Sequence, residues 1–235
     1  MEKSILTCVS CYYPVRNKHD NKYWEWFENT LSIRCPYVFF TTKEHIEKIK
    51  ELRKGLPTYF IEYEIEEFYM NGFKDLMVEH PRHCPSHELN MIWNEKMMMM
   101  EKVAELNPFG SEWFQWMDAG ICVYRNEKPP DRGYPDLEKL KRVPKDRMIY
   151  SSSNPYYKGY VSPKNYYHHV SGTSYLIHMG LLKEMVQIYK SYLSKLVDRN
   201  NIWTDQVIWT HIYKDHPEKF YLLGEGYGEC VRILF

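Results

Sequence analysis

The chain has 235 residues, of which 44% are hydrophobic and 26% are charged, and this size and composition are typical of one large α/β domain with a buried core. Lysine plus arginine and aspartate plus glutamate each number 31, so the chain lacks the overall positive charge of many nucleic-acid-binding proteins. No apolar run approaches the roughly 20 residues that a membrane-spanning helix needs, and the N-terminus has no apolar leader. We therefore expect a cytoplasmic protein with no transmembrane segment and no nucleic-acid partner.

Short apolar segments alternate with amphipathic ones through the first 62 residues. Buried strands and helices are predicted in the order Ser4–Ser10, Lys22–Ile33, Pro36–Thr41, Lys43–Lys54 and Thr58–Glu62, beginning with a strand. Thr42 is placed to cap the second helix, which Gly55 and Pro57 end. Such alternation indicates a parallel sheet with crossover helices.

The remainder of the chain continues this pattern with longer connections. A long helix is predicted from Ser86 to Asn107, where Asn107-Pro108 stops it, and its run Met97–Met100 is expected to fill irregular core space. Further strands are expected at Trp113–Asp118, Met148–Ser151, His169–Ile177 and Phe220–Leu223. Helices are expected at Leu181–Leu196 and Asp205–Tyr213, and Thr204 is placed to cap the second of these. The polar, proline-rich segment Arg125–Asp146 is expected to be a loop or a loose helical excursion, and a loop rich in Tyr, Pro and Gly is expected at Asn154–Tyr167. The whole chain, 1–235, is therefore predicted to be one α/β domain with a mostly parallel central sheet flanked by helices.

Asp118 ends an apolar, aromatic segment and is followed by Ala119 and Gly120, where the backbone can turn sharply. Open α/β sheets bind ligands in the crevice outside the carboxyl ends of their strands, and Asp118 lies at such an end. A divalent cation that bridges a carboxylate and a diphosphate suits this position, because Mg²⁺ and Mn²⁺ prefer oxygen ligands. The alternative is a turn aspartate that accepts hydrogen bonds from nearby backbone donors.

Four segments together resemble the HtrL/YibB-like glycosyltransferases, including the sugar-transferring domains of large algal viruses. They are Glu88–Lys96 with Asn107-Pro108-Phe109, Phe114–Gly120, Val170–Thr173 and Trp203–Gln206. In order and spacing they cover nearly all of the chain. The resemblance implies a GT-A-like fold and transfer of a sugar from a nucleotide-diphosphate donor, with UDP as the expected nucleotide, to a hydroxyl of a glycan acceptor.

Within this reading, Asp118 is expected to hold Mn²⁺ or Mg²⁺ against the donor diphosphate, and Lys96 to contact the same diphosphate as a point charge. Asp205 is expected to orient or deprotonate the acceptor hydroxyl. The other expected nucleotide-sugar contacts are Tyr12, Arg16, Asn94 and Gly120. The expected acceptor or sugar contacts are His169, Gly172, Thr173, Trp203 and Gln206.

Several alternatives stay open at the level of sequence. Many GT-A enzymes carry Asp-x-Asp, whereas Gly120 stands at the second position here, which keeps a catalytically silent nucleotide- or glycan-binding module as an alternative. A nucleotidyltransferase is a third possibility, but it favours a glycine-rich loop after the first strand, and Cys11–Asp20 contains no glycine. Asp205 also has a purely structural alternative in the first turn of its helix. Lys96 has a structural alternative as well, as a solvated lysine on the surface of a helix.

Overall fold

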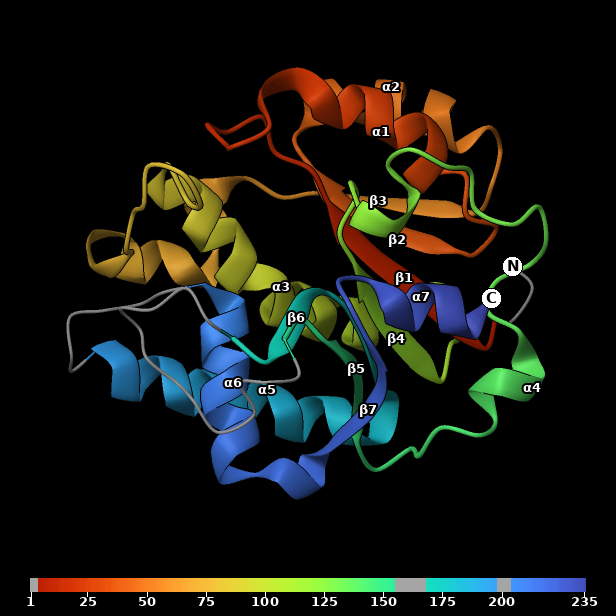
Figure 1. The fold of residues 1–235 in the computed structure, drawn as a ribbon. Coiled ribbons are helices and arrows are strands. Elements are labelled where there is room, and N and C mark those ends of the chain that lie inside the picture. Colours follow the sequence, from red (N-terminus) through yellow and green to blue (C-terminus); the bar gives the residue numbers. More distant parts are fainter. Residues whose placement is uncertain (1–3, 155–167, 198–203) are drawn as a thin grey trace.

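A seven-stranded mixed sheet organises the residues that the computed structural model describes, namely 4–154, 168–197 and 204–235 (Figure 1). The strand order is β3-β2-β1-β4-β6-β5-β7. The strands are β1 (Leu6–Cys11), β2 (Tyr37–Thr41), β3 (Thr58–Glu62), β4 (Trp113–Met117), β5 (Met148–Ser152), β6 (Val170–His178) and β7 (Phe220–Glu225). The α-helices are α1 (Tyr23–Thr30), α2 (Lys43–Arg53), α3 (His87–Leu106), α4 (Leu137–Leu140), α5 (Met179–Val197), α6 (Asp205–Asp215) and α7 (Glu229–Leu234).

The predicted mostly parallel sheet between helices is confirmed, and it agrees with the GT-A-like fold that the resemblance implies. One strand departs from the parallel expectation, because β6 runs antiparallel to both of its neighbours, β4 and β5. The short helix α7 was not predicted, and α4 lies within the segment Arg125–Asp146, for which a loose helical excursion was one of the two expectations. The loop predicted at Asn154–Tyr167 lies outside the described residues except for Asn154.

Both predicted threonine caps are in place by position but not by hydrogen bonding. Thr42 and Thr204 occupy the N-cap positions of α2 and α6, yet neither side chain bonds to the first turn of its helix. The Thr42 hydroxyl instead lies 2.8 Å from Nδ1 of His45. Neither hydroxyl therefore caps its helix.

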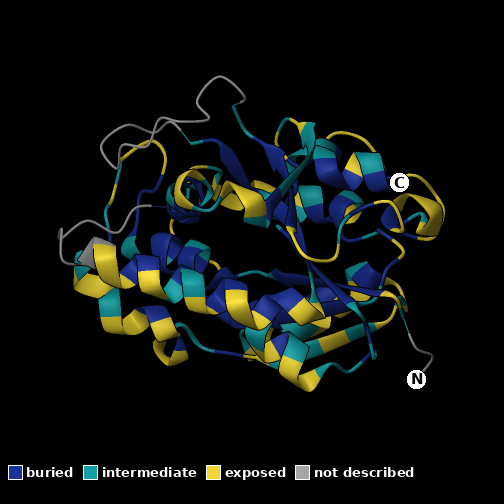
Figure 2. Cartoon of the chain, turned by 90° about the horizontal axis from the view of Figure 1, so that it is seen from below, coloured by how far each residue is buried: buried dark blue, intermediate teal, exposed yellow. Residues whose placement is uncertain are grey.

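The two faces of the sheet bury separate apolar clusters, as expected when both faces are covered by helices. Successive strand residues point to opposite faces, so Val9, Phe114 and Trp116 join the cluster under α3, α5 and α6. Leu6 and Trp113 join the cluster under α1, α2 and α7. Figure 2 shows the buried sheet between helices whose outer sides are exposed.

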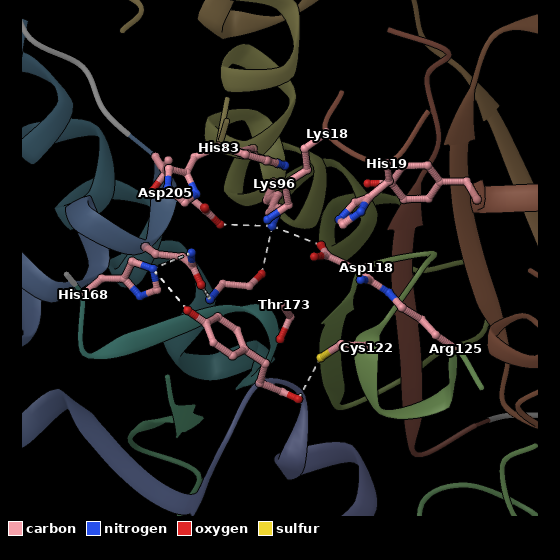
Figure 3. A pocket seen from close by; sticks show the side chains of 16 residues that line it. Lys18, His19, His83, Lys96, Asp118, Cys122, Arg125, His168, Thr173 and Asp205 are labelled. Atoms are coloured by element: carbon pink, nitrogen blue, oxygen red, sulfur yellow. Dashed lines mark hydrogen bonds and ion pairs between the residues drawn. The ribbon is translucent and has the colours of Figure 1, made fainter. Parts of the chain in front are cut away.

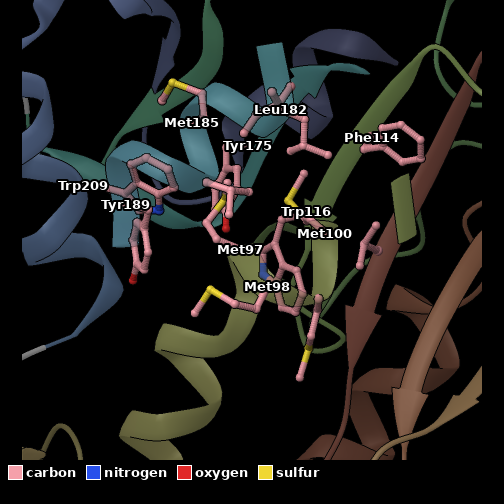
Figure 4. Close-up of a cluster of buried hydrophobic side chains, with 14 of the residues drawn as sticks. Met97, Met98, Met100, Phe114, Trp116, Tyr175, Leu182, Met185, Tyr189 and Trp209 are labelled. Carbon is pink, nitrogen blue, oxygen red and sulfur yellow. The ribbon is translucent and has the colours of Figure 1, made fainter. Parts of the chain in front are cut away.

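Helix α3 supplies much of the first cluster. The side chain of its N-cap residue Ser86 accepts a hydrogen bond from the backbone N–H of Leu89, as the sequence predicted for the start of this helix. The methionine run Met97–Met100 is buried and packs with Trp116 and side chains of α5 and α6, which confirms its gap-filling role (Figure 4). No helix among the described residues is both long and apolar enough to cross a bilayer.

Candidate functional site

A cavity of about 480 Å³ opens at the end of the sheet where β1 and β4 finish and the antiparallel β6 begins (Figure 3). This is the crevice in which open α/β sheets bind ligands, and the volume suits a small-molecule site. Its lining comes from Lys18, His19, Tyr23, His83, Trp93, Lys96, Asp118, Cys122, Arg125, His168, Gly172, Thr173, Thr204, Asp205, Gln206 and Tyr227. A smaller second cavity of about 70 Å³ shares Tyr23, Trp93, Lys96, Asp118 and Arg125 with it.

Regular secondary structure directs the charged side chains into this cavity. Asp118 follows β4 and its backbone N–H still bonds to the carbonyl of Thr173 at 2.9 Å, so its side chain lies on the same face as that of Trp116. That face is covered by α3, where Trp93 and Lys96 share one side of the helix at spacing i, i+3. Asp205 arrives from a third direction as the first residue of α6.

The ammonium group of Lys96 joins three separate elements. Its Nζ lies 3.0 Å from Oδ1 of Asp118 and 3.1 Å from Oδ2 of Asp205. It also donates a hydrogen bond of 2.8 Å to the carbonyl oxygen of Gly172. The contacts with the two carboxylates are ion pairs, and the contact with Gly172 is a hydrogen bond. Asp118 Oδ1 additionally accepts a 2.7 Å hydrogen bond from the indole Nε1 of Trp116.

The carboxylates of Asp118 and Asp205 differ in how far they are buried. The side chain of Asp118 is 32% exposed, whereas those of Asp205 and Lys96 are each 4% exposed. Burial raises the pKa of Asp205 to about 6, with the nearby charge of Asp118 adding to the effect and Lys96 opposing it. Burial alone would lower the pKa of Lys96, but the two aspartates outweigh it and raise that pKa, so the lysine stays charged at neutral pH.

Gly172 is placed where only a hydrogen can fit. A Cβ at this position would lie 2.4 Å from Oδ2 of Asp205 and 2.8 Å from Cγ of Gln206. The backbone N–H of Gly172 donates to Oε1 of Gln206 at 2.9 Å, and its carbonyl accepts from Lys96. Gly172 lines the cavity, and its missing side chain leaves room for Asp205; its expected contact with a sugar stays a prediction.

We expect Gly172→Ala to destabilise the protein by about 1–3 kcal/mol, because the added methyl group overpacks the contact with Asp205 and Gln206. Urea unfolding of the two proteins measures the difference. Gly133→Ala is the matched control, since a Cβ there meets no atom within 4 Å. Equal stability of the wild-type protein and Gly172→Ala would show that Asp205 moves aside freely and is not held in position.

Most of the predicted site residues meet at the cavities. Lys96, Asp118, Gly172, Thr173, Asp205 and Gln206 line the large cavity, and Tyr12 and Gly120 line the small one. Trp203 lies outside the described residues. The ring of Tyr12 packs edge-on against Trp24 and Phe27, with ring centroids 4.9 and 5.1 Å apart. Gly120 allows close packing, because a Cβ there would lie 2.9 Å from the ring of Tyr23.

Three of the predicted residues are not brought to either cavity. Asn94 is fully buried and bonds to Asn90 and to the hydroxyl of Tyr189 at 2.9 Å, because it faces away from the side of α3 that carries Lys96. His169 is fully buried beside Tyr150, with its Nε2 2.8 Å from the tyrosine hydroxyl. Arg16 is exposed and its carbonyl accepts a hydrogen bond from Ser86. These side chains support the surrounding structure instead of lining the site.

The sequence reading missed several residues that line the large cavity, among them Lys18, Trp93, Arg125 and Tyr227. Lys18 lies two residues beyond Arg16 in the loop after β1, and Arg125 follows the turn after Asp118. Their positions after two parallel strands were a usable signal, since such loops surround ligand sites. Trp93 had a signal too, being one helical turn before Lys96. Tyr227 follows β7, and the sequence offered no comparable signal for it.

Three histidines, His19, His83 and His168, line the large cavity, and His168 is the neighbour of the one expected. Burial lowers the pKa of His168 to about 4, and burial together with the charge of Arg125 lowers that of His19 to about 4. Both rings are therefore neutral at pH 7. Nε2 of His168 lies 3.0 Å from Nε2 of Gln206, which suits a neutral ring that accepts the amide proton.

The donor set does not favour the Mn²⁺ or Mg²⁺ expected at Asp118. Among residues 4–154, 168–197 and 204–235, no three or more His, Cys, Asp or Glu side chains are grouped to hold a metal ion. The two carboxylates at the cavity, Asp118 and Asp205, already share the ammonium of Lys96. A divalent cation between them would have to displace that buried ammonium. The metal stays an untested prediction, and no reaction step is assigned to it.

Comparisons with known proteins place the chain in a family. A solved structure similar to it is 4-diphosphocytidyl-2C-methyl-D-erythritol synthase from Anaerococcus prevotii, with 8% sequence identity, a TM-score of 0.45, and coverage of 98% of this chain and 96% of that chain. A likeness at this level carries no inference about chemistry. No curated protein matches the chain significantly. The family described as "Bacterial protein of unknown function (HtrL_YibB)" matches residues 50–234, and the chain therefore belongs to the HtrL_YibB family.

Proposed function

We propose that this protein is a glycosyltransferase, a single domain over residues 1–235 that moves a sugar from a nucleotide-diphosphate donor, with UDP as the expected nucleotide, to a hydroxyl of a glycan acceptor. The observation that carries the proposal is the Asp118–Lys96–Asp205 cluster at the ligand-binding end of the sheet. It combines an accessible carboxylate with a buried one whose pKa is raised to about 6. Paired groups of this kind are typical of acid–base chemistry.

Asp205 is the proposed general base. In the transfer, the acceptor hydroxyl gives its proton to the Asp205 carboxylate while its oxygen bonds to the anomeric carbon. The bond between that carbon and the donor phosphate oxygen breaks, and the nucleoside diphosphate leaves with the bonding electrons. A carboxylate with a pKa of about 6 is well matched to this task, because it is ionised at pH 7 and still basic enough to take a proton.

Asp118 is proposed to contact the donor, and Lys96 to hold the two carboxylates in position. The carboxylate of Asp118 faces the cavity and is partly exposed, so it is placed to accept hydrogen bonds from hydroxyl groups of the donor. Lys96 was expected to contact the diphosphate, but its ammonium already lies within ion-pair distance of Asp118 and Asp205 and donates a hydrogen bond to Gly172. We therefore assign it the role of holding the two carboxylates in position and of opposing the rise in the pKa of Asp205.

A panel of nucleotide sugars tests the proposal. UDP-, GDP- and TDP-sugars are incubated with the full chain, once with Mn²⁺ and once with EDTA, and nucleoside diphosphate release is measured. We expect release from at least one UDP-sugar, and we expect it to persist in EDTA because Lys96 occupies the place between the carboxylates. Asp118→Asn should lower the release rate.

The two alternatives give different results in the same experiment. A silent nucleotide- or glycan-binding module would bind a nucleotide without turning over any donor. A nucleotidyltransferase would release pyrophosphate from a nucleoside triphosphate in the presence of a sugar phosphate. Either result, with no nucleotide-sugar turnover, rejects the glycosyltransferase proposal.

A further inference from the structure

Lys18 and Arg125 are two positive charges at the cavity that the proposed transfer step does not use (Figure 3). Lys18 comes from the loop after β1, and Arg125 comes from the segment after β4. Neither side chain forms an ion pair with any carboxylate in the described part of the chain, whereas Lys96 contacts two. Two like charges near one cavity that have no ion-pair partner among the described residues favour binding of an anion.

The guanidinium group of Arg125 is held in place while its outer nitrogens stay available. Its Nε donates a 2.8 Å hydrogen bond to the carbonyl of Gly120, and its carbon lies 3.9 Å from the ring centroid of Trp26. No described residue bonds to the two terminal nitrogens of Arg125. A guanidinium oriented in this way is suited to bidentate recognition of phosphate oxygens.

Lys18 lies close enough to Arg125 for their charges to interact. Burial lowers the pKa of Lys18, and the positive charge of Arg125 lowers it further, while Asp118 opposes the effect. An anion bound between the two cations would remove this repulsion. The cavity histidines His19 and His168 have pKa values of about 4, so they are neutral at pH 7 and do not take this role.

An aromatic cavity adjoins this pair of cations. The smaller cavity is lined by Tyr12, Tyr13, Tyr23, Trp93 and Trp116, and it shares Arg125 with the larger one. Aromatic side chains beside a phosphate-binding group suit a nucleoside, whose base offers a flat apolar face. The ligand chemistry that matches both parts is a nucleoside diphosphate.

We propose that Lys18 and Arg125 bind the diphosphate of the donor nucleotide and stabilise the charge that develops on it as it leaves. The proposal rests on the proposed function for the identity of the ligand, but its test measures binding and not transfer. In this arrangement the two cations supply the charge that the sequence reading had attributed to a metal ion at Asp118.

The test is isothermal titration calorimetry of the full chain with UDP and, separately, with inorganic pyrophosphate, both in EDTA. We expect both probes to bind the wild-type protein, and we expect Lys18→Ala and Arg125→Ala each to weaken binding of both about 10- to 100-fold, as for the loss of a charge-assisted hydrogen bond. Lys22→Ala is the matched control, because Lys22 is an exposed lysine that lines neither cavity. Thermal melting of each variant verifies the fold, and Arg125→Lys keeps the charge if Arg125→Ala is unstable.

The possible outcomes separate this inference from the proposed function. If UDP and pyrophosphate bind the wild type and both variants equally, or bind only when Mn²⁺ is added, the role of Lys18 and Arg125 is rejected, while nucleotide-sugar turnover still decides the proposed function. If the variants lose binding but no nucleotide sugar is turned over, diphosphate binding by Lys18 and Arg125 is supported and the glycosyltransferase proposal is rejected. Failure of both probes to bind the wild type also rejects the cation pair.

Discussion

Asp205→Asn is expected to reduce sugar transfer by about 10²–10⁴-fold, the range found when a general base is removed. The amide keeps the shape of the side chain but cannot accept the proton of the acceptor hydroxyl. Because Asp205 is 2% exposed and lies at the start of α6, the substitution leaves the cavity wall nearly unchanged. Affinity for UDP should stay near that of the wild type, since the proposed diphosphate contacts lie elsewhere.

The pH dependence of sugar transfer is a second test of Asp205 as the general base. Burial raises the pKa of Asp205 to about 6, so the carboxyl group is protonated and inactive as a base below that pH and is ionised above it. Transfer by the wild type should therefore rise through pH 6 and level off, and Asp205→Asn should lack this rise. A residual rate with the same pH profile would place the titrating base at another residue.

Asp215→Asn is the control on the same helix, since this carboxylate lies at the far end of α6, bonds to the hydroxyl of Tyr192 and does not line the cavity. Its transfer rate should match the wild type. Loss of UDP binding by Asp205→Asn would move Asp205 from the acceptor side to the donor side. Unchanged transfer would leave it with a structural role in the first turn of α6.

Lys96→Met is expected to lower the free energy of unfolding by about 3–5 kcal/mol, the usual result of removing one partner from a buried ion pair. Methionine fills a similar volume, so the main loss is electrostatic. The carboxylates of Asp118 and Asp205 would face each other without the ammonium that lies 3.0 and 3.1 Å from them. Transfer should be lost as well, because both carboxylates depend on Lys96 for their positions.

The stability loss caused by Lys96→Met should depend on pH, in a direction that follows from the same charges. Without Lys96, the pKa of Asp205 should rise further, since the ammonium is the group that opposes the effects of burial and of Asp118. Protonation of Asp205 relieves the repulsion, so the loss of stability should be smaller at pH 5 than at pH 8. Urea unfolding at the two pH values measures this difference. The double variant Lys96→Met/Asp205→Asn should recover part of the loss at pH 8.

Lys102→Met is the matched control, because Lys102 is an exposed lysine on α3 whose ammonium lies 4.8 Å from the ring centroid of Tyr63. Its loss should cost no more than about 1 kcal/mol. If Lys96→Met were as stable as Lys102→Met at both pH values, the ion cluster would contribute nothing measurable. Lys96 would then be better described as a mobile side chain.

The local pattern of residues was enough to locate most helices and strands. Thr58–Glu62 was predicted with both ends correct, and α3 was predicted within one residue at each end, because Ser86 and Asn107-Pro108 mark its limits chemically. The direction of β6 was not predictable, since an apolar strand has the same side-chain alternation whether its neighbours run parallel or antiparallel. The helix α7 was missed because six residues are too few to show a clear period.

The sequence by itself determined that an acidic residue follows a core strand at Asp118, and that Lys96 and Asp205 belong to helices near the same sheet. Only the tertiary structure decided that these three charges form one cluster, that Asn94 and His169 point elsewhere, and that Lys18 and Arg125 line the cavity. The physical reason is that periodicity specifies which face of its own element a side chain occupies. Which other element covers that face depends on the order and direction of the strands, and these are set by packing between segments far apart in the chain.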